Sequence, residues 1–89
     1  MIAANVTIVN KLGLHARAAS RLVNCASGFV ADIEIARGTR SVNAKSIMGV
    51  LTLAAAIGTE LVLQADGPDE KQAVEALTTL FQDRFGEHE

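Results

Sequence analysis

A histidine and an arginine that lie two positions apart are the residues of this sequence best suited to chemistry. His15 and Arg17 stand where a loop is expected to enter a helix over residues 16–27. An imidazole is nucleophilic and partly neutral near pH 7, and a guanidinium presents a planar set of donors that matches phosphate oxygens. The pair therefore predicts a site at which a phosphoryl group is carried on His15.

The helix that positions this pair is indicated by its apolar face. Apolar residues recur at i, i+3, i+4 and i+7, namely Ala19, Leu22, Val23 and Ala26, and Gly28 predicts a left-handed C-terminal cap. No Ser, Thr, Asp or Asn stands at the N-cap. The first N–H groups of the helix are therefore open to an anion. A histidine at a helix start is also compatible with a merely solvated side chain.

Two blocks of the sequence resemble one known family. GLHAR at residues 13–17 resembles the active-site motif of HPr, the histidine-containing phosphocarrier of the bacterial phosphoenolpyruvate:sugar phosphotransferase system. KSIMGVL at residues 45–51 is similar to the regulatory-serine helix of that family. The separation of the blocks fits, and the resemblance covers essentially the whole chain. Ala18 stands where the family usually has proline, but alanine keeps the backbone N–H and a high helix propensity.

The resemblance implies a role for each polar group of the first block. His15 would take a phosphoryl group on ring Nδ1 from enzyme I and pass it to an enzyme IIA domain. Arg17 would stabilise the phosphoryl oxygens, and the backbone N–H groups of Ala16 and Arg17 would complete the phosphate cradle. Arg21, one helical turn further on, either extends this positive patch or is an ordinary solvated arginine. No cofactor is implied.

Ser46 precedes a short helix that we expect over residues 47–53, and its side chain is predicted to cap that helix. In some HPr proteins the matching serine is also phosphorylated by an ATP-dependent kinase, the HPr kinase/phosphorylase. The resemblance therefore implies regulatory phosphorylation at Ser46. The sequence leaves open whether such a kinase acts on this chain.

The short helix carries more apolar residues than one buried face can hold. We expect the surplus, Ile47, Met48 and Leu51, to form an exposed apolar patch that binds partners; the alternative is additional core. The resemblance implies that this patch and the rim of the active site bind enzyme I and the enzyme IIA domains. The expected docking surface consists of Ser20, Arg21, Ile47, Met48 and Leu51.

The remaining patterns predict the fold. Strands are indicated at residues 5–9, 31–35, 41–43 and 61–65, and a capping box of Asp69 and Gln72 begins a final helix. The order is βαββαβα, and alternating strands indicate a sheet with one wet face. The resemblance implies an α+β open-faced β-sandwich, a four-stranded antiparallel sheet covered on one face by three helices. We expect residues 1–89 to form a single domain with a frayed tail at residues 86–89.

Composition and charge argue against several other functions. The net charge of −2 and the lack of a basic run do not suit a nucleic-acid binder, and the exposed strand aromatics of RNA-binding βαββαβ domains are missing. No apolar run reaches the ~20 residues of a membrane span. His15 and His88 lack the clustered ligands of a metal site. The lone Cys25 suits a reducing compartment, so we expect a cytoplasmic protein, and we also expect it to be a monomer.

Two other functions remain open at this point. The nitrogen-related branch of HPr-like proteins shares the chemistry of His15 but phosphorylates a regulatory enzyme IIA instead of a sugar permease. Neither Ala18 nor residues 43–46 distinguish this branch. The second alternative is a purely regulatory binding module that depends on phosphorylation of Ser46, and His15 argues against that as the only role. Our prediction is a stoichiometric phosphocarrier, not an enzyme.

Overall fold

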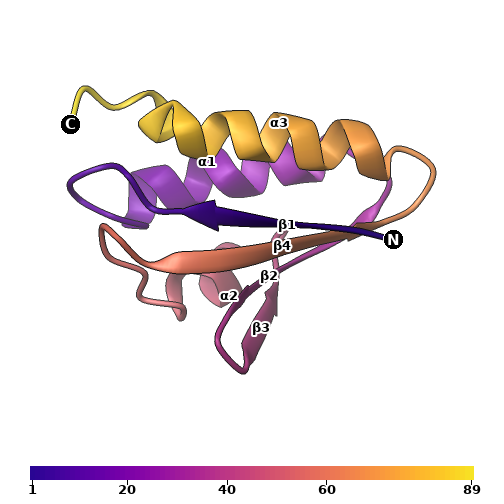
Figure 1. Cartoon of the computed structure of the whole chain (residues 1–89), viewed down its shortest axis with the longest axis horizontal. Coiled ribbons are helices and arrows are strands. Elements are labelled where there is room, and N and C mark those ends of the chain that lie inside the picture. Colours follow the sequence, from indigo (N-terminus) through magenta and orange to yellow (C-terminus); the bar gives the residue numbers. More distant parts are fainter.

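The computed structural model describes all 89 residues and places helices α1 and α3 together against one face of a sheet (Figure 1). No helix is both long enough and apolar enough to span a membrane. The chain follows the predicted order, and the elements are β1 (Ile2–Thr7), α1 (Ala16–Ser27), β2 (Asp32–Arg37), β3 (Arg40–Asn43), α2 (Ile47–Leu51), β4 (Glu60–Asp66), α3 (Glu70–Gln82) and a 3-10 turn η1 (Arg84–Gly86).

The four strands form one antiparallel sheet in the order β1-β4-β2-β3. The central strand β4 pairs with both neighbours, so that Leu63 lies opposite Ala4 of β1 and Ile35 of β2. Side chains along β4 alternate strictly between exposed and buried, which is the pattern of a sheet with one covered face. The predicted α+β open-faced β-sandwich is therefore confirmed.

The covered face of the sheet packs against α1 and α3 in a single core of 22 buried apolar residues. Leu22 of α1 and Leu77 of α3 are fully buried in it, and each such side chain contributes about 1.5–3 kcal/mol. Phe85 lies beyond the end of α3 and is also fully buried. Its ring meets that of Phe81 edge to face, with centroids 4.9 Å apart. The core therefore extends beneath the C-terminal segment.

Two expected helix ends differ from the structure. Gly28 is not a left-handed cap, because its φ is −76° and its N–H bonds to the carbonyls of the last turn of α1. The second helix ends at Leu51 instead of residue 53, although Leu53 is still buried in the core. Apolar periodicity thus locates the buried side chains more reliably than it locates the end of the hydrogen-bonded turn.

The predicted capping box at the start of α3 is wrong. The Asp69 carboxylate makes no capping bond. It instead accepts hydrogen bonds from the N–H groups of Val30, at 2.8 Å, and Ala31, at 2.9 Å. The bond from Val30, followed by that from Ala31, holds the pKa of Asp69 below its usual range. Asp69 therefore ties the start of α3 to the loop that enters β2.

Candidate functional site

His15 occupies the N-cap of α1 with an extended backbone, and its side chain makes no capping bond. The first helical hydrogen bond runs from the N–H of Ala19 to the carbonyl of His15 at 2.8 Å. The N–H groups of Ala16, Arg17 and Ala18 therefore precede the helical ladder and face the loop side of the helix. The helix start is uncapped, as the sequence indicated, and Ala18 adds an N–H that proline would lack; binding of an anion there stays a prediction.

The loop before His15 is held by its neighbours. The N–H of Leu14 donates to the carbonyl of Ala55 at 2.8 Å, and the leucine side chain is buried. Asn10 is fully buried, and its amide Nδ2 donates to the carbonyl of Gly13 at 2.8 Å. These contacts fix where the chain enters α1 and therefore where the imidazole lies.

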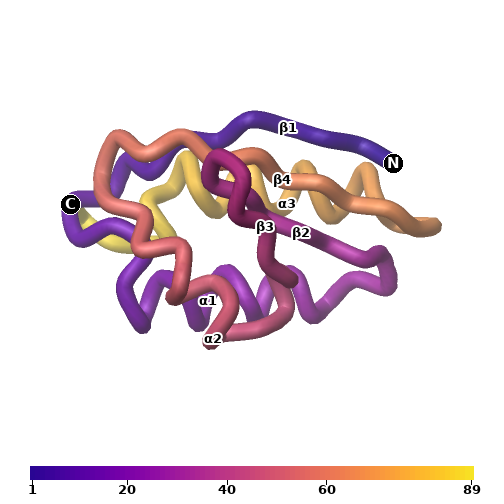
Figure 2. The backbone as a smooth tube through the Cα atoms, turned by 90° about the horizontal axis from the view of Figure 1, so that it is seen from below, coloured from indigo at the N-terminus to yellow at the C-terminus, as the bar shows by residue number.

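The C-terminal segment, residues 84–89, lies beside this loop in both views (Figures 1 and 2). Glu87 Oε2 is 2.5 Å from His15 Nε2, and Glu87 Oε1 accepts a hydrogen bond from Asn10 Nδ2 at 2.9 Å. The His15 side chain is 28% exposed and that of Glu87 is 11% exposed. The predicted fraying of residues 86–89 is therefore wrong, because Glu87 lies against the imidazole.

The charge of Glu87 follows from its partners. The hydrogen bond from Asn10, and then the hydrogen bond and charge of His15, hold the pKa of Glu87 below its usual range, with a smaller effect from Arg17. A carboxyl group with such a pKa is ionised at neutral pH. The site therefore combines an imidazole and an anionic carboxylate with open N–H groups at a helix start.

The two arginines of α1 have different surroundings. The side chain of Arg17 is exposed and has no hydrogen-bond partner in the chain, so its guanidinium is available to an anion. Arg21 is also exposed, but its guanidinium donates to the carbonyl of Phe85. Arg21 therefore ties the C-terminal segment to α1, a contact that the sequence did not indicate; its place in the positive patch stays a prediction.

Sequence reasoning missed Asn10 and Glu87. No local pattern marks either residue, because each is important through a partner far along the chain. One signal was available: Leu77, Phe81 and Phe85 recur at intervals of four, which extends the apolar face of the last helix to position 85. That spacing would have indicated that the chain remains packed as far as Phe85, two positions before Glu87.

The second block is arranged largely as expected. Ser46 Oγ accepts the N–H of Gly49 at 3.2 Å, which confirms the predicted N-cap of α2. Met48 is 69% exposed. Ile47 and Leu51 are half-buried and pack against the core, so the expected exposure of all three apolar residues holds fully only for Met48. Ser20 is exposed on α1; the docking role of these residues stays a prediction.

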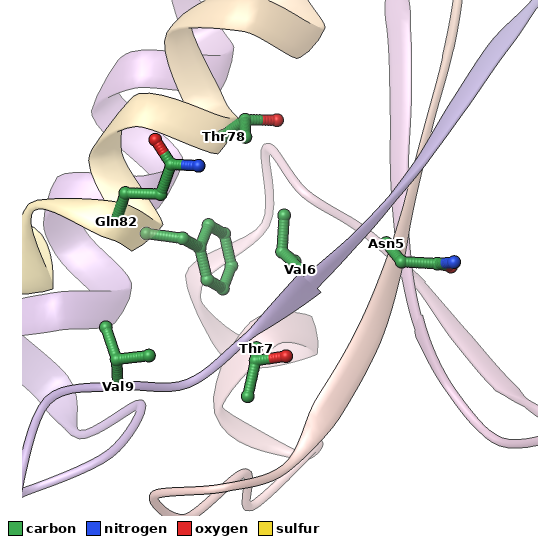
Figure 3. A pocket seen from close by; sticks show the side chains of 7 residues that line it. Asn5, Val6, Thr7, Val9, Thr78 and Gln82 are labelled. Atoms are coloured by element: carbon green, nitrogen blue, oxygen red, sulfur yellow. The ribbon is translucent and has the colours of Figure 1, made fainter.

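One cleft of the surface lies away from these residues. A cleft of about 250 Å³ between β1 and α3 is lined by apolar, amide and hydroxyl side chains (Figure 3). Val6 and Thr7 lie on its strand side, and Thr78 and Gln82 on its helix side. It contains no titratable group and none of the predicted site residues. No three His, Cys, Asp or Glu side chains are grouped to hold a metal ion.

Comparisons with known proteins bear on this site. The family model of the PTS HPr component phosphorylation site matches residues 2–83. Over 89 residues and the full length of both chains, the sequence is 52% identical to phosphocarrier protein HPr of Cupriavidus necator and 46% identical to that of Neisseria meningitidis serogroup A. A crystal structure of HPr from Thermoanaerobacter tengcongensis superimposes with a TM-score of 0.96 at 42% identity and full coverage of both chains. The chain belongs to the HPr family of phosphocarrier proteins.

Proposed function

We propose that this chain is a stoichiometric phosphoryl carrier that takes a phosphoryl group from phosphorylated enzyme I and delivers it to enzyme IIA domains through His15. The observation that carries the proposal is the open N-terminus of α1 beside His15, with the free guanidinium of Arg17 in the first turn. Phosphoryl transfer depends mainly on positioning and on stabilisation of charge. This arrangement supplies both without a cofactor.

In the proposed reaction, His15 Nδ1 forms a bond to phosphorus while the bond from phosphorus to the donor breaks. The electron pair of the broken bond leaves with the donor. Arg17 and the N–H groups of Ala16 and Arg17 would face the phosphoryl oxygens, because cations and helix N-termini stabilise such anions. The chain returns unchanged after the second transfer, so we class it as a carrier and not as an enzyme.

The partners would meet the chain on the surface around this site. We infer that Met48 is the apolar centre of the docking surface, with Ile47, Leu51, Ser20 and Arg21 around it. Exposed apolar patches of this kind mark protein contacts. We also propose that the chain is a cytoplasmic, monomeric carrier that folds as one domain over residues 1–89.

Ser46 is proposed as a regulatory phosphorylation site for an HPr kinase/phosphorylase. The residue is half-buried at the N-cap of α2, where added negative charge is favourable to a helix. Regulation would then act on partner binding and not on the fold. The resemblance at residues 45–51 is the support for this role.

The proposed function is tested by mixing the chain with phosphoenolpyruvate and enzyme I and recording intact mass. The wild type should gain one phosphoryl group that is labile in acid. His15→Ala should fold normally and gain none, and Arg17→Ala should gain it more slowly because one charge partner is lost. A phosphorylated His15→Ala chain would contradict the assignment, and a wild type that gains no phosphate would contradict the carrier role.

A further inference from the structure

The contact between His15 and Glu87 joins residues 72 positions apart in the chain. We propose that Glu87 is a positioning residue for phosphoryl transfer: its carboxylate keeps a proton on His15 Nε2, so that Nδ1 carries the lone pair that attacks phosphorus. This inference rests on the proposed function of His15, and it adds a residue that neither sequence block contains.

The direction of the hydrogen bond follows from chemistry. An ionised carboxylate can only accept hydrogen bonds, so the 2.5 Å contact with Glu87 Oε2 requires that His15 Nε2 is the donor. A neutral imidazole carries a single N–H. When Nε2 holds that hydrogen, the lone pair available for attack is on Nδ1. The same nitrogen is the one that the family resemblance implies as the acceptor.

Asn10 determines which carboxylate oxygen faces the imidazole. Its amide nitrogen lies 2.8 Å from the carbonyl oxygen of Gly13 and 2.9 Å from Glu87 Oε1. Both partners are acceptors, so the network assigns the NH₂ group of the amide to this position. Oε1 of Glu87 is thus occupied by Asn10, and Oε2 is left to His15.

The C-terminal segment is built to keep Glu87 in this place. The ring of Phe85 is fully buried, and its carbonyl accepts a hydrogen bond from Arg21. Arg84 and Phe85 have φ values of 55° and 54°, in the left-handed region that L residues seldom adopt. Such conformations persist only where the surroundings enforce them, and they concentrate at functional sites. The buried ring and the arginine supply that enforcement.

The proton on Nε2 has a role throughout the transfer. When Nδ1 bonds to phosphorus and the bond to the donor breaks, the ring becomes positively charged and Nε2 keeps its proton. The carboxylate of Glu87 stabilises that charge, as an acidic partner does for the imidazole of a catalytic triad. On delivery the bond between Nδ1 and phosphorus breaks, its electron pair returns to Nδ1, and the neutral Nε2–H form is restored.

The test compares Glu87→Gln, Glu87→Ala and the control Glu89→Gln. In Glu87→Gln, Asn10 still binds the amide oxygen, so the new NH₂ group faces His15 Nε2 and donates to it, which moves the ring proton to Nδ1. Glu87→Ala removes the partner without imposing the wrong tautomer. Glu89 is a matched control because its carboxylate is 73% exposed and pairs only with Lys11, at 3.4 Å.

Two measurements are made on each variant. The ¹⁵N chemical shifts of the His15 ring nitrogens report the tautomer of the free protein, and rapid-quench mixing with phosphorylated enzyme I gives the transfer rate. In Glu89→Gln we expect the ring proton of His15 on Nε2 and a transfer rate equal to that of the wild type. Glu87→Ala should transfer a few-fold more slowly, and Glu87→Gln should show Nδ1–H with transfer reduced at least about tenfold.

The relative transfer rates of Glu87→Gln and Glu87→Ala separate this positioning role from a purely structural one. If Glu87 only supported the fold, glutamine would preserve its function better than alanine would. We expect the melting temperature of Glu87→Gln to be higher than that of Glu87→Ala, whereas the transfer rates should follow the opposite order. A Glu87→Gln chain that retains Nε2–H, or that transfers faster than Glu87→Ala, would overturn the proposal. A wild type that accepts no phosphoryl group would instead overturn the proposed function, and the transfer role of Glu87 with it.

Discussion

Replacement of Gly13 by alanine should damage the loop that presents His15. Gly13 has a φ of +70°, and a Cβ atom at this position would lie 2.6 Å from the carbonyl oxygen of Ala55 and 3.0 Å from the Cα of Ala56. Both neighbours are backbone atoms and cannot rotate away. The same carbonyl of Ala55 accepts the hydrogen bond from Leu14, so any shift that relieves the overlap also disturbs that bond.

The expected loss has two parts. A left-handed conformation costs an L residue about 1–2 kcal/mol, and forcing packed backbone apart costs about 1–3 kcal/mol. The midpoint of the sum is about 3.5 kcal/mol. For a domain of this size about 1 kcal/mol corresponds to 4–8 °C, so the melting temperature of Gly13→Ala should fall by roughly 14–28 °C.

Gly38→Ala is the matched control, because Gly38 has a φ of +59° and no atom within 4 Å of its added Cβ. It should lose only the conformational part, about 1–2 kcal/mol. Thermal and urea unfolding of both variants measure the difference, and transfer from enzyme I should be slowed only in Gly13→Ala. Equal losses of stability would show that the approach of Ala55 is not what excludes a side chain at position 13.

Three further predictions concern other parts of the chain. Met48→Glu should weaken binding to enzyme I by about 1–3 kcal/mol with little change in melting temperature, because Met48 is 69% exposed; calorimetric titration measures this, and a destabilised variant with unchanged affinity would contradict it. Ser46→Asp should leave stability unchanged or raised by about 0.3–1 kcal/mol at low salt and should slow transfer to His15. That defect should shrink across a salt series, since screening weakens repulsion between exposed charges; wild-type transfer at low salt would contradict an electrostatic effect. The folded pKa of Asp69 lies below its ordinary value of 3.8, so its stabilising contribution is complete above that value and is lost as the pH falls through the folded pKa. The stability difference between wild type and Asp69→Asn should therefore be largest near neutral pH and shrink below about pH 4; a difference that is constant in urea unfolding from pH 7 to pH 2 would contradict the role of this carboxylate.

The sequence by itself determined the features that depend on near neighbours. Apolar spacing of three and four residues identified α1, because a helix repeats every 3.6 residues, and the expected range of residues 16–27 agrees with the structure. The same local logic identified Ser46 as the cap of α2, since its partner Gly49 is three residues away. The absence of a capping side chain before α1 marked His15 as an unusual helix start, and the structure retains that feature.

The tertiary structure alone decided which distant groups complete these features. The pairing of β4 with both β1 and β2 could not be derived from alternation, which shows the faces of a strand but not its neighbours. Asp69 looked like a local cap and instead bonds to a loop nearly forty residues earlier. Glu87 looked like part of a frayed tail, yet the burial of Phe85 brings it to His15. A polar side chain takes whichever partner packing brings within reach, and packing joins parts of the chain whose distance in sequence carries no signal.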